Sequence, residues 1–157
     1  MVKNKLISLI ICLFIFSGCG FKVVNLSELN NFYINEIDTE GDKRVSYEIR
    51  NNLISMTKDP EKKLINLKLN TNKTKIVKEK NIKNEITKYE INLAVNITTY
   101  DKKYDILHQF TETSKGSYDV SKQHSQTLSN EKKQTMILSK KISERILSKL
   151  RNISNDF

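Results

Sequence analysis

Hydrophobic residues recur along this chain with two different periods. In the longest regular run they occupy every second position, as Tyr89, Ile91, Leu93, Val95 and Ile97. Such alternation is typical of a strand with one face on a hydrophobic core and the other in water. Similar runs predict two further strands, one at residues 65–69 that resumes at 76–77 and one at 104–110, and a hydrophobic patch predicts a first strand at 32–37. The connections are short, as at 100–103, which favours antiparallel pairing.

Two other segments place hydrophobic residues three or four positions apart, the spacing of an amphipathic helix. These residues are Val45, Ile49, Leu53 and Met56 in the first segment, and Leu138, Ile142, Ile146, Leu150 and Ile153 in the second. The first helix follows a predicted turn at 38–42, in which Gly41 breaks the pattern and Asp42 is suited to cap the helix. The second helix is expected at 130–150, after a polar stretch at 116–129 that has no periodicity and is predicted to be a loop.

The order of elements is therefore strand, helix, three strands, helix. Two amphipathic helices can cover one face of a small sheet, so the sequence predicts an α+β fold. We expect the two helices to pack on one face of a mostly antiparallel four-stranded sheet. Residues 19–157 are numerous enough for a single domain with one core.

The N-terminus has the order of a secretory signal peptide. Lys3 and Lys5 precede a hydrophobic run at 6–16, which is too short to span a bilayer, and small residues follow. The run Phe16-Ser17-Gly18-Cys19 resembles the lipobox of bacterial lipoproteins, with Phe16 where leucine is usual. This resemblance implies a lipoprotein signal peptide at 1–18 and lipid, including palmitate, on Cys19. The alternative is a buried N-terminal helix that ends before Cys19.

The chain is basic, with 27 Lys and Arg against 18 Asp and Glu and a formal charge of +9. A basic protein favours anionic partners, and export excludes nucleic acid as the partner here. Lysines cluster around the predicted turn near residue 82, and Lys78, Lys80 and Lys83 are candidates to contact an anionic glycolipid or a partner protein. The alternative is that these lysines are merely solvated and protect the sheet from edge-to-edge aggregation.

Little in the sequence points to catalysis. His108 falls within an alternating strand and is expected to pack there, and His124 falls in the predicted loop. The sequence contains neither a metal-binding histidine motif nor a glycine-rich phosphate loop nor a nucleophile elbow. We therefore expect a protein that is not an enzyme and that uses no metal or cofactor.

Several of these segments together resemble the LptE family of lipopolysaccharide-assembly lipoproteins. The residues that carry the resemblance are Cys19-Gly20-Phe21, the strand from Tyr89 to Asn96, Ser117-Tyr118-Asp119 and the helix at 130–150. The resemblance implies two helices on a four-stranded sheet and an anchor on the periplasmic side of the outer membrane. It also implies a role as plug and assembly partner of the LptD β-barrel, which delivers lipopolysaccharide to the cell surface.

The same resemblance implies contact with lipopolysaccharide through basic residues, but the matching positions, Ile82 and Thr127, are not basic here. The contact would then fall to Lys80 and Lys83, which flank Ile82, and the predicted loop at 116–129 would contact the barrel. The alternative function is that of an envelope lipoprotein that binds cell-wall glycan or another envelope complex.

Overall fold

The computed structural model describes residues 32–57, 62–100 and 106–155. Its elements are β1 (Phe32–Gly41), α2 (Lys43–Met56), β2 (Lys63–Lys80), β3 (Ile86–Tyr100), β4 (Ile106–Asp119) and α3 (His124–Asn155). The predicted order of strand, helix, three strands and helix is confirmed, and so is the α+β class. The predicted signal peptide and Cys19 lie outside the described residues.

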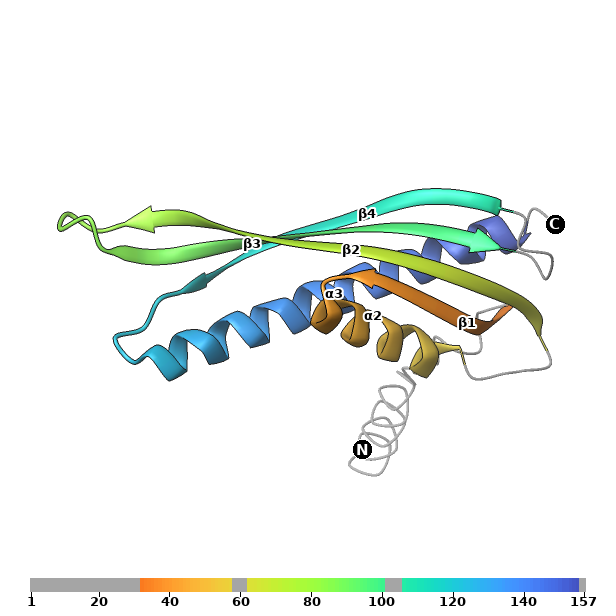
Figure 1. The fold of residues 1–157 in the computed structure, drawn as a ribbon, viewed down its shortest axis with the longest axis horizontal. Helices are drawn as coiled ribbons and strands as arrows, with labels where there is room; N and C mark the ends of the chain where they lie inside the picture. The colour runs from red at the N-terminus through yellow and green to blue at the C-terminus, as the bar shows by residue number, and fades with distance from the viewer. Residues whose placement is uncertain (1–31, 58–61, 101–105, 156–157) are drawn as a thin grey trace, which may run out of the picture.

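The four strands form one sheet in the order β1-β2-β3-β4, and both helices cover the same face of it (Figure 1). The pairs β2–β3 and β3–β4 are antiparallel, as expected from the short connections. The pair β1–β2 is parallel, so the sheet as a whole is mostly antiparallel, as predicted. Helix α2 lies between them in sequence and carries the chain back to the end of the sheet where β1 began, as a parallel pair requires.

The core lies between the sheet and the two helices. From the sheet it receives the alternating residues predicted to face inward, of which Ile91, Val95 and Ile97 are fully buried. From α3 it receives Ile142 and Ile146, which are also fully buried. The predicted hydrophobic faces of both the central strand and the last helix are thus confirmed. Removal of this hydrophobic surface from water is the main source of the stability of the fold.

At the junction between β1 and α2 the structure differs from the prediction. The predicted turn at 38–42 is mostly strand, because β1 continues to Gly41 and pairs with β2 up to Thr71. Gly41 has a φ of 90°, and a Cβ atom there would lie 1.9 Å from the Thr71 carbonyl oxygen. Asp42 then caps α2 as predicted, since its carboxylate accepts hydrogen bonds from the Arg44 and Val45 amides at 3.1 and 2.9 Å.

The predicted loop at 116–129 is also corrected. Strand β4 continues to Asp119 because that end pairs with β3, and α3 already begins at His124. Most residues in the first turns of this 32-residue helix are exposed, so no hydrophobic periodicity marks them in the sequence. The segment available as a contact loop therefore shrinks to residues 120–123.

Candidate functional site

The hairpin of β2 and β3 projects past the helical layer and carries the lysines singled out from the sequence (Figure 1). They do not form one site. Lys78 forms an ion pair with Glu90 at 3.3 Å and donates a hydrogen bond to Ser117 at 2.7 Å. Lys80 donates to the side chain of Asn84 at 3.0 Å, and Lys83 lies within the connecting turn. Lys78 is thus largely neutralised within the protein.

The turn at the end of this hairpin is held by its own hydrogen bonds. The Asn81 side chain accepts hydrogen bonds from the amides of Lys83 and Glu85 at 2.9 and 3.0 Å. The Asn81 backbone donates to the Glu85 carbonyl at 2.9 Å, and Asn84 takes a φ of 63°, which asparagine tolerates well. Between these residues Ile82 is fully exposed. The protein therefore presents a hydrophobic side chain on an ordered, lysine-flanked tip.

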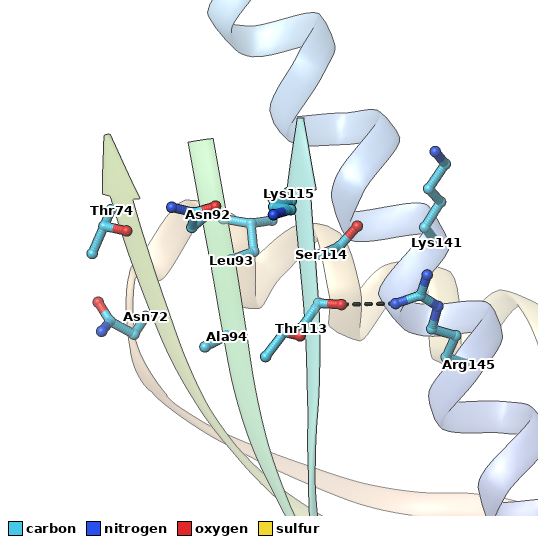
Figure 2. Close-up of a pocket in the computed structure, with 10 residues that line it drawn as sticks. All are labelled: Asn72, Thr74, Asn92, Leu93, Ala94, Thr113, Ser114, Lys115, Lys141 and Arg145. Carbon is cyan, nitrogen blue, oxygen red and sulfur yellow. Dashed lines mark hydrogen bonds between the residues drawn. The ribbon is translucent and has the colours of Figure 1, made fainter. Parts of the chain in front are cut away.

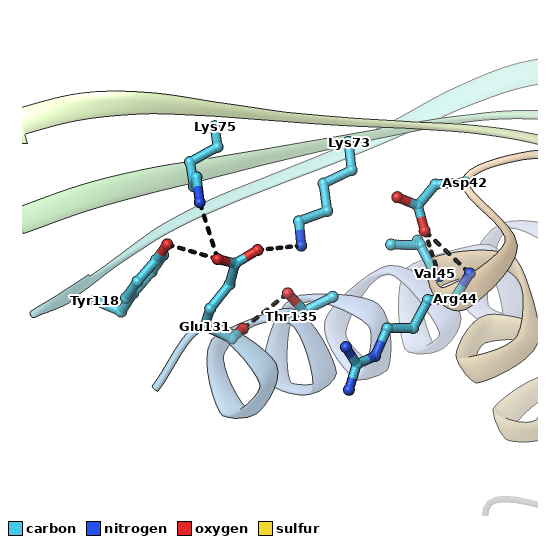
Figure 3. A network of polar contacts seen from close by, with 8 residues as sticks. All are labelled: Asp42, Arg44, Val45, Lys73, Lys75, Tyr118, Glu131 and Thr135. Atoms are coloured by element: carbon cyan, nitrogen blue, oxygen red, sulfur yellow. Dashed lines mark hydrogen bonds and ion pairs between the residues drawn. The ribbon is translucent and has the colours of Figure 1, made fainter. Parts of the chain in front are cut away.

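A second polar cluster fastens the first half of α3 to the sheet, and its centre is Glu131 (Figure 3). The Glu131 carboxylate accepts hydrogen bonds from Lys73 at 2.7 Å, from Lys75 at 3.1 Å and from the Tyr118 hydroxyl at 2.9 Å. The Lys75 ammonium also lies 4.8 Å from the ring centre of Tyr89. Lys73 and Lys75 thus lie within β2 and contact the helical layer rather than a ligand.

These contacts change the acidity of the groups that make them. Burial alone would raise the pKa of the Glu131 carboxyl, but hydrogen bonds from Lys73, Tyr118 and Lys75 outweigh it and lower that pKa from 4.5 to about 2. Burial and the bond to the Glu131 carboxylate raise the pKa of the Tyr118 hydroxyl well above its ordinary range. Glu131 is therefore ionised and Tyr118 neutral at any physiological pH, which suits a structural cluster.

A hollow of about 550 Å³ lies at the free edge of β4, next to α3 (Figure 2). Three cationic side chains line it: Lys115 from β4, and Lys141 and Arg145 from α3. Arg145 donates a hydrogen bond to the Thr113 carbonyl at 2.7 Å and so covers part of the strand edge. The other lining residues are Asn72, Thr74, Asn92, Leu93, Ala94, Thr113 and Ser114, none of which is acidic.

Sequence reasoning missed this hollow. Lys115 falls outside the lysine cluster near residue 82, and Lys141 and Arg145 look like ordinary solvated residues of an amphipathic helix. Only the packing of α3 along β4 places Lys141 and Arg145 beside the strand that carries Lys115. The four-residue spacing of Lys141 and Arg145 places them on one side of a helix, and this was the only indication in the sequence.

The remaining chemistry is sparse. Within residues 32–57, 62–100 and 106–155, no three His, Cys, Asp or Glu side chains gather closely enough to hold a metal ion. Neither of the helices that the structure describes has the length and hydrophobicity needed to cross a membrane. His108 is half-buried on β4, and His124 is the first residue of α3 rather than part of a loop.

Comparison with known proteins gives the same fold in bacterial lipoproteins. No protein-family model and no curated protein sequence matches the chain. A structure from Caulobacter crescentus described as a lipoprotein matches with a TM-score of 0.63 at 15% identity, over 83% of this chain and 95% of that one. Rare lipoprotein B from Shewanella oneidensis matches with a TM-score of 0.57 at 12% identity, and the match covers 78% of this chain and 98% of that one. Lipoprotein B from Nitrosomonas europaea matches with a TM-score of 0.58 at 13% identity, and the match covers 87% of this chain and 93% of that one. At these identities the likeness shows a shared fold.

Proposed function

We propose that this protein is an outer-membrane lipoprotein that acts as plug and assembly partner of an LptD-type β-barrel during delivery of lipopolysaccharide to the cell surface. In this proposal lipid on Cys19 anchors the chain on the periplasmic side. The observation that supports it is the fold. The match covers more than nine-tenths of the length of each of three solved proteins named as lipoproteins, and rare lipoprotein B is one of them. The same fold is the one that resemblance to LptE implies.

The surface of the domain suits a protein enclosed in a water-filled barrel. The face of the sheet opposite the helices is polar, and its central positions are amides and hydroxyls such as Asn70, Asn92 and Asn96. Several of its lysines pair with carboxylates, as Lys88 does with Glu79 at 3.0 Å. A surface of this kind can lie against a wet wall without a large desolvation cost. In this proposal the protein works through its shape, without catalysis.

The hairpin tip is the part that we propose enters a partner. Ile82 is fully exposed on a turn that is already ordered, so its burial in a barrel pocket or among lipid chains would cost little conformational entropy. Lys80 and Lys83 flank it and can meet anionic groups on the glycolipid or the barrel. Lys78 contributes less than its position suggests, because Glu90 already pairs with it.

Purification of the tagged, full-length protein from outer membranes tests the partner. We expect an LptD-type barrel as the dominant co-purifying protein. Ile82→Asp should reduce barrel recovery severalfold without lowering the melting temperature, since this side chain is fully exposed. Recovery of cell-wall glycan or another envelope complex in place of the barrel would contradict the proposal and favour the alternative function.

Binding of lipopolysaccharide by charge variants tests the role of the tip. The double variant Lys80→Gln/Lys83→Gln should bind more weakly, and added salt should weaken binding by the unaltered protein in the same way. A matched control removes two exposed lysines from α3, Lys132 and Lys133. Equal binding by the tip variant and the control would exclude direct glycolipid contact at the tip while leaving the barrel partnership standing.

A further inference from the structure

Strand β2 is paired on both of its sides over only part of its length. Strand β1 pairs with it as far as Thr71, where β1 ends at Gly41, whereas β3 pairs with it up to Lys80. Among the residues that the structure describes, no segment pairs with residues 72–80 on the side away from β3. This part of β2 is therefore an open sheet edge, and it projects beyond β1 and α2 (Figure 1).

The backbone of this edge can form hydrogen bonds with a further strand. The Thr71 carbonyl points away from β3, because it accepts a hydrogen bond from the Asp42 amide at 3.0 Å. In a strand with an antiparallel neighbour, the N–H and C=O groups of every second residue point to the same side. The pairing with β3 is regular up to Val77, so the backbone groups of Lys73, Lys75 and Val77 also point away from β3.

A hollow of about 410 Å³ lies beside this edge, where β2, the start of α2 and the first turns of α3 meet. Lys73 lines it from β2 and Leu128 lines it from α3. Leu128 is 53% exposed, and Val77, which is on the same face of β2 as Lys73, is 44% exposed. Two hydrophobic side chains on the helical side of the sheet are thus left in water next to an open edge.

The charges around the hollow are not balanced. Glu131 lines the hollow, but its carboxylate already accepts three hydrogen bonds from side chains of the fold (Figure 3). Arg44 and Lys132 line it as well, and no carboxylate among the described residues lies within ion-pair distance of either. Arg44 lies just after the point where β1 leaves the sheet, so these cations can pair with a carboxylate at that end of the edge.

We propose that the open edge of β2 binds an extended peptide segment of a partner protein, which adds to the sheet as a further strand. The segment runs antiparallel to β2, because that pairing is the more stable one. Its alternate side chains are hydrophobic and contact Val77 and Leu128, and a carboxylate at its C-terminal end pairs with Arg44 and Lys132. The site does not involve Ile82, so it goes beyond the function proposed for the hairpin tip.

Fluorescence anisotropy with the full-length protein, purified in detergent, tests this binding. The probe is a labelled peptide in which threonine and valine alternate and which ends in glutamate. A second peptide has the same sequence, with N-methyl groups on the alternate amides that would face β2. It should bind at least about tenfold more weakly, because it cannot donate the backbone hydrogen bonds of a strand. Equal binding by the two peptides would overturn strand addition.

Amide hydrogen exchange followed by NMR locates the bound peptide. In the protein alone, the amides of Lys75 and Val77 should exchange faster than those of Thr74 and Ile76, which face β3. The peptide should slow exchange at Lys75 and Val77 and leave the other two unchanged. Bound peptide without slower exchange at Lys75 and Val77 would overturn the site.

Charge variants test the end of the edge near α2. Arg44→Gln/Lys132→Gln should weaken peptide binding by about tenfold, the combined effect of two exposed ion pairs. The matched control is Lys43→Gln/Lys133→Gln, which removes the neighbouring exposed cations that do not line the hollow. This control should bind as the unaltered protein does. Equal weakening in the two double variants would contradict a specific carboxylate contact.

Hydrophobic variants test the other end. Leu128→Ala should weaken peptide binding severalfold, whereas Ile137→Ala, which changes an exposed residue of α3 that does not line the hollow, should not. Both side chains are at least 40% exposed, so neither change should lower the melting temperature. Equal binding by the two variants would overturn the contact with Leu128. Slow exchange at Lys75 and Val77 that depends on protein concentration without peptide would assign the edge to a second copy of this chain instead, and so overturn the proposal.

Discussion

Replacement of Glu131 by glutamine tests the polar cluster that joins α3 to the sheet. The ionised carboxylate accepts hydrogen bonds from Lys73, Lys75 and Tyr118, and its side chain is only 20% exposed. The fall of its pKa from 4.5 to about 2 corresponds to about 3 kcal/mol, at about 1.4 kcal/mol for each pH unit. Glu131→Gln should therefore lower the free energy of unfolding at pH 7 by about 2–3 kcal/mol. Part of the cost arises because Lys73, which is 18% exposed, loses its counter-charge.

The sign of the pH dependence follows from the direction of this pKa change. Because the pKa of Glu131 is lower in the folded protein, its contribution is complete above about pH 4.5 and is lost as the pH falls towards 2. Urea unfolding of the wild-type protein and of Glu131→Gln, at steps from pH 7 to pH 2, measures this. The difference in free energy of unfolding between the wild-type protein and Glu131→Gln should become smaller as the pH falls from about 4.5 to 2.

A matched control is Glu144→Gln, which changes an exposed carboxylate on the same helix. It should alter the free energy of unfolding by less than about 0.5 kcal/mol at every pH. If the difference between the wild-type protein and Glu131→Gln stayed constant from pH 7 to pH 2, the carboxylate would not be the charge that holds α3 to the sheet.

Three further changes test the fold and the anchor. Gly41→Ala should destabilise the protein by more than about 2 kcal/mol in a urea melt, because φ is positive there and the new methyl group would meet the Thr71 carbonyl; a neutral result would mean that the junction can shift. Ile142→Ala should cost about 2–5 kcal/mol and Lys140→Ala little, since only the former is buried; equal effects would contradict the helix face. Cys19→Ala should abolish incorporation of labelled fatty acid, and label retained in that variant would refute the lipoprotein reading.

The elements whose hydrophobic residues recur at a regular spacing could be predicted from the sequence. The alternation from Tyr89 to Ile97 and the helical spacing around Ile142 each identify a buried face, because burial acts on side chains at regular intervals. The cap at Asp42 was also predictable, since its chemistry is local. These features depend on residues close together in the chain.

The features that the sequence did not reveal depend on contacts between distant segments. The residues of β1 from Asp38 to Gly41 look like a turn, and they become strand only because β2 pairs with them. The start of α3 is mostly polar, and it is fastened to the sheet by Glu131 rather than by a hydrophobic stripe. Such contacts leave no periodic pattern to detect.

The same reason explains the outcome for the candidate site. The candidate lysines Lys78, Lys80 and Lys83 lie close together in the sequence, but the charge available to a ligand depends on which lysines pair with a carboxylate in the fold. Lys78 finds Glu90, whereas Lys115 and Lys141 find none among the described residues. No pattern along the sequence distinguishes lysines that pair with a carboxylate from those that do not, because the carboxylates come from other strands and helices.

Depletion of this protein in its own cells, followed by measurement of the folded LptD-type barrel in the outer membrane, tests the central proposal most directly. If the protein is a plug and assembly partner, the amount of correctly folded barrel should fall and lipopolysaccharide at the cell surface should fall with it. Restored expression of the wild-type protein should recover both. Normal levels of folded barrel and of surface lipopolysaccharide after depletion would contradict the proposed function.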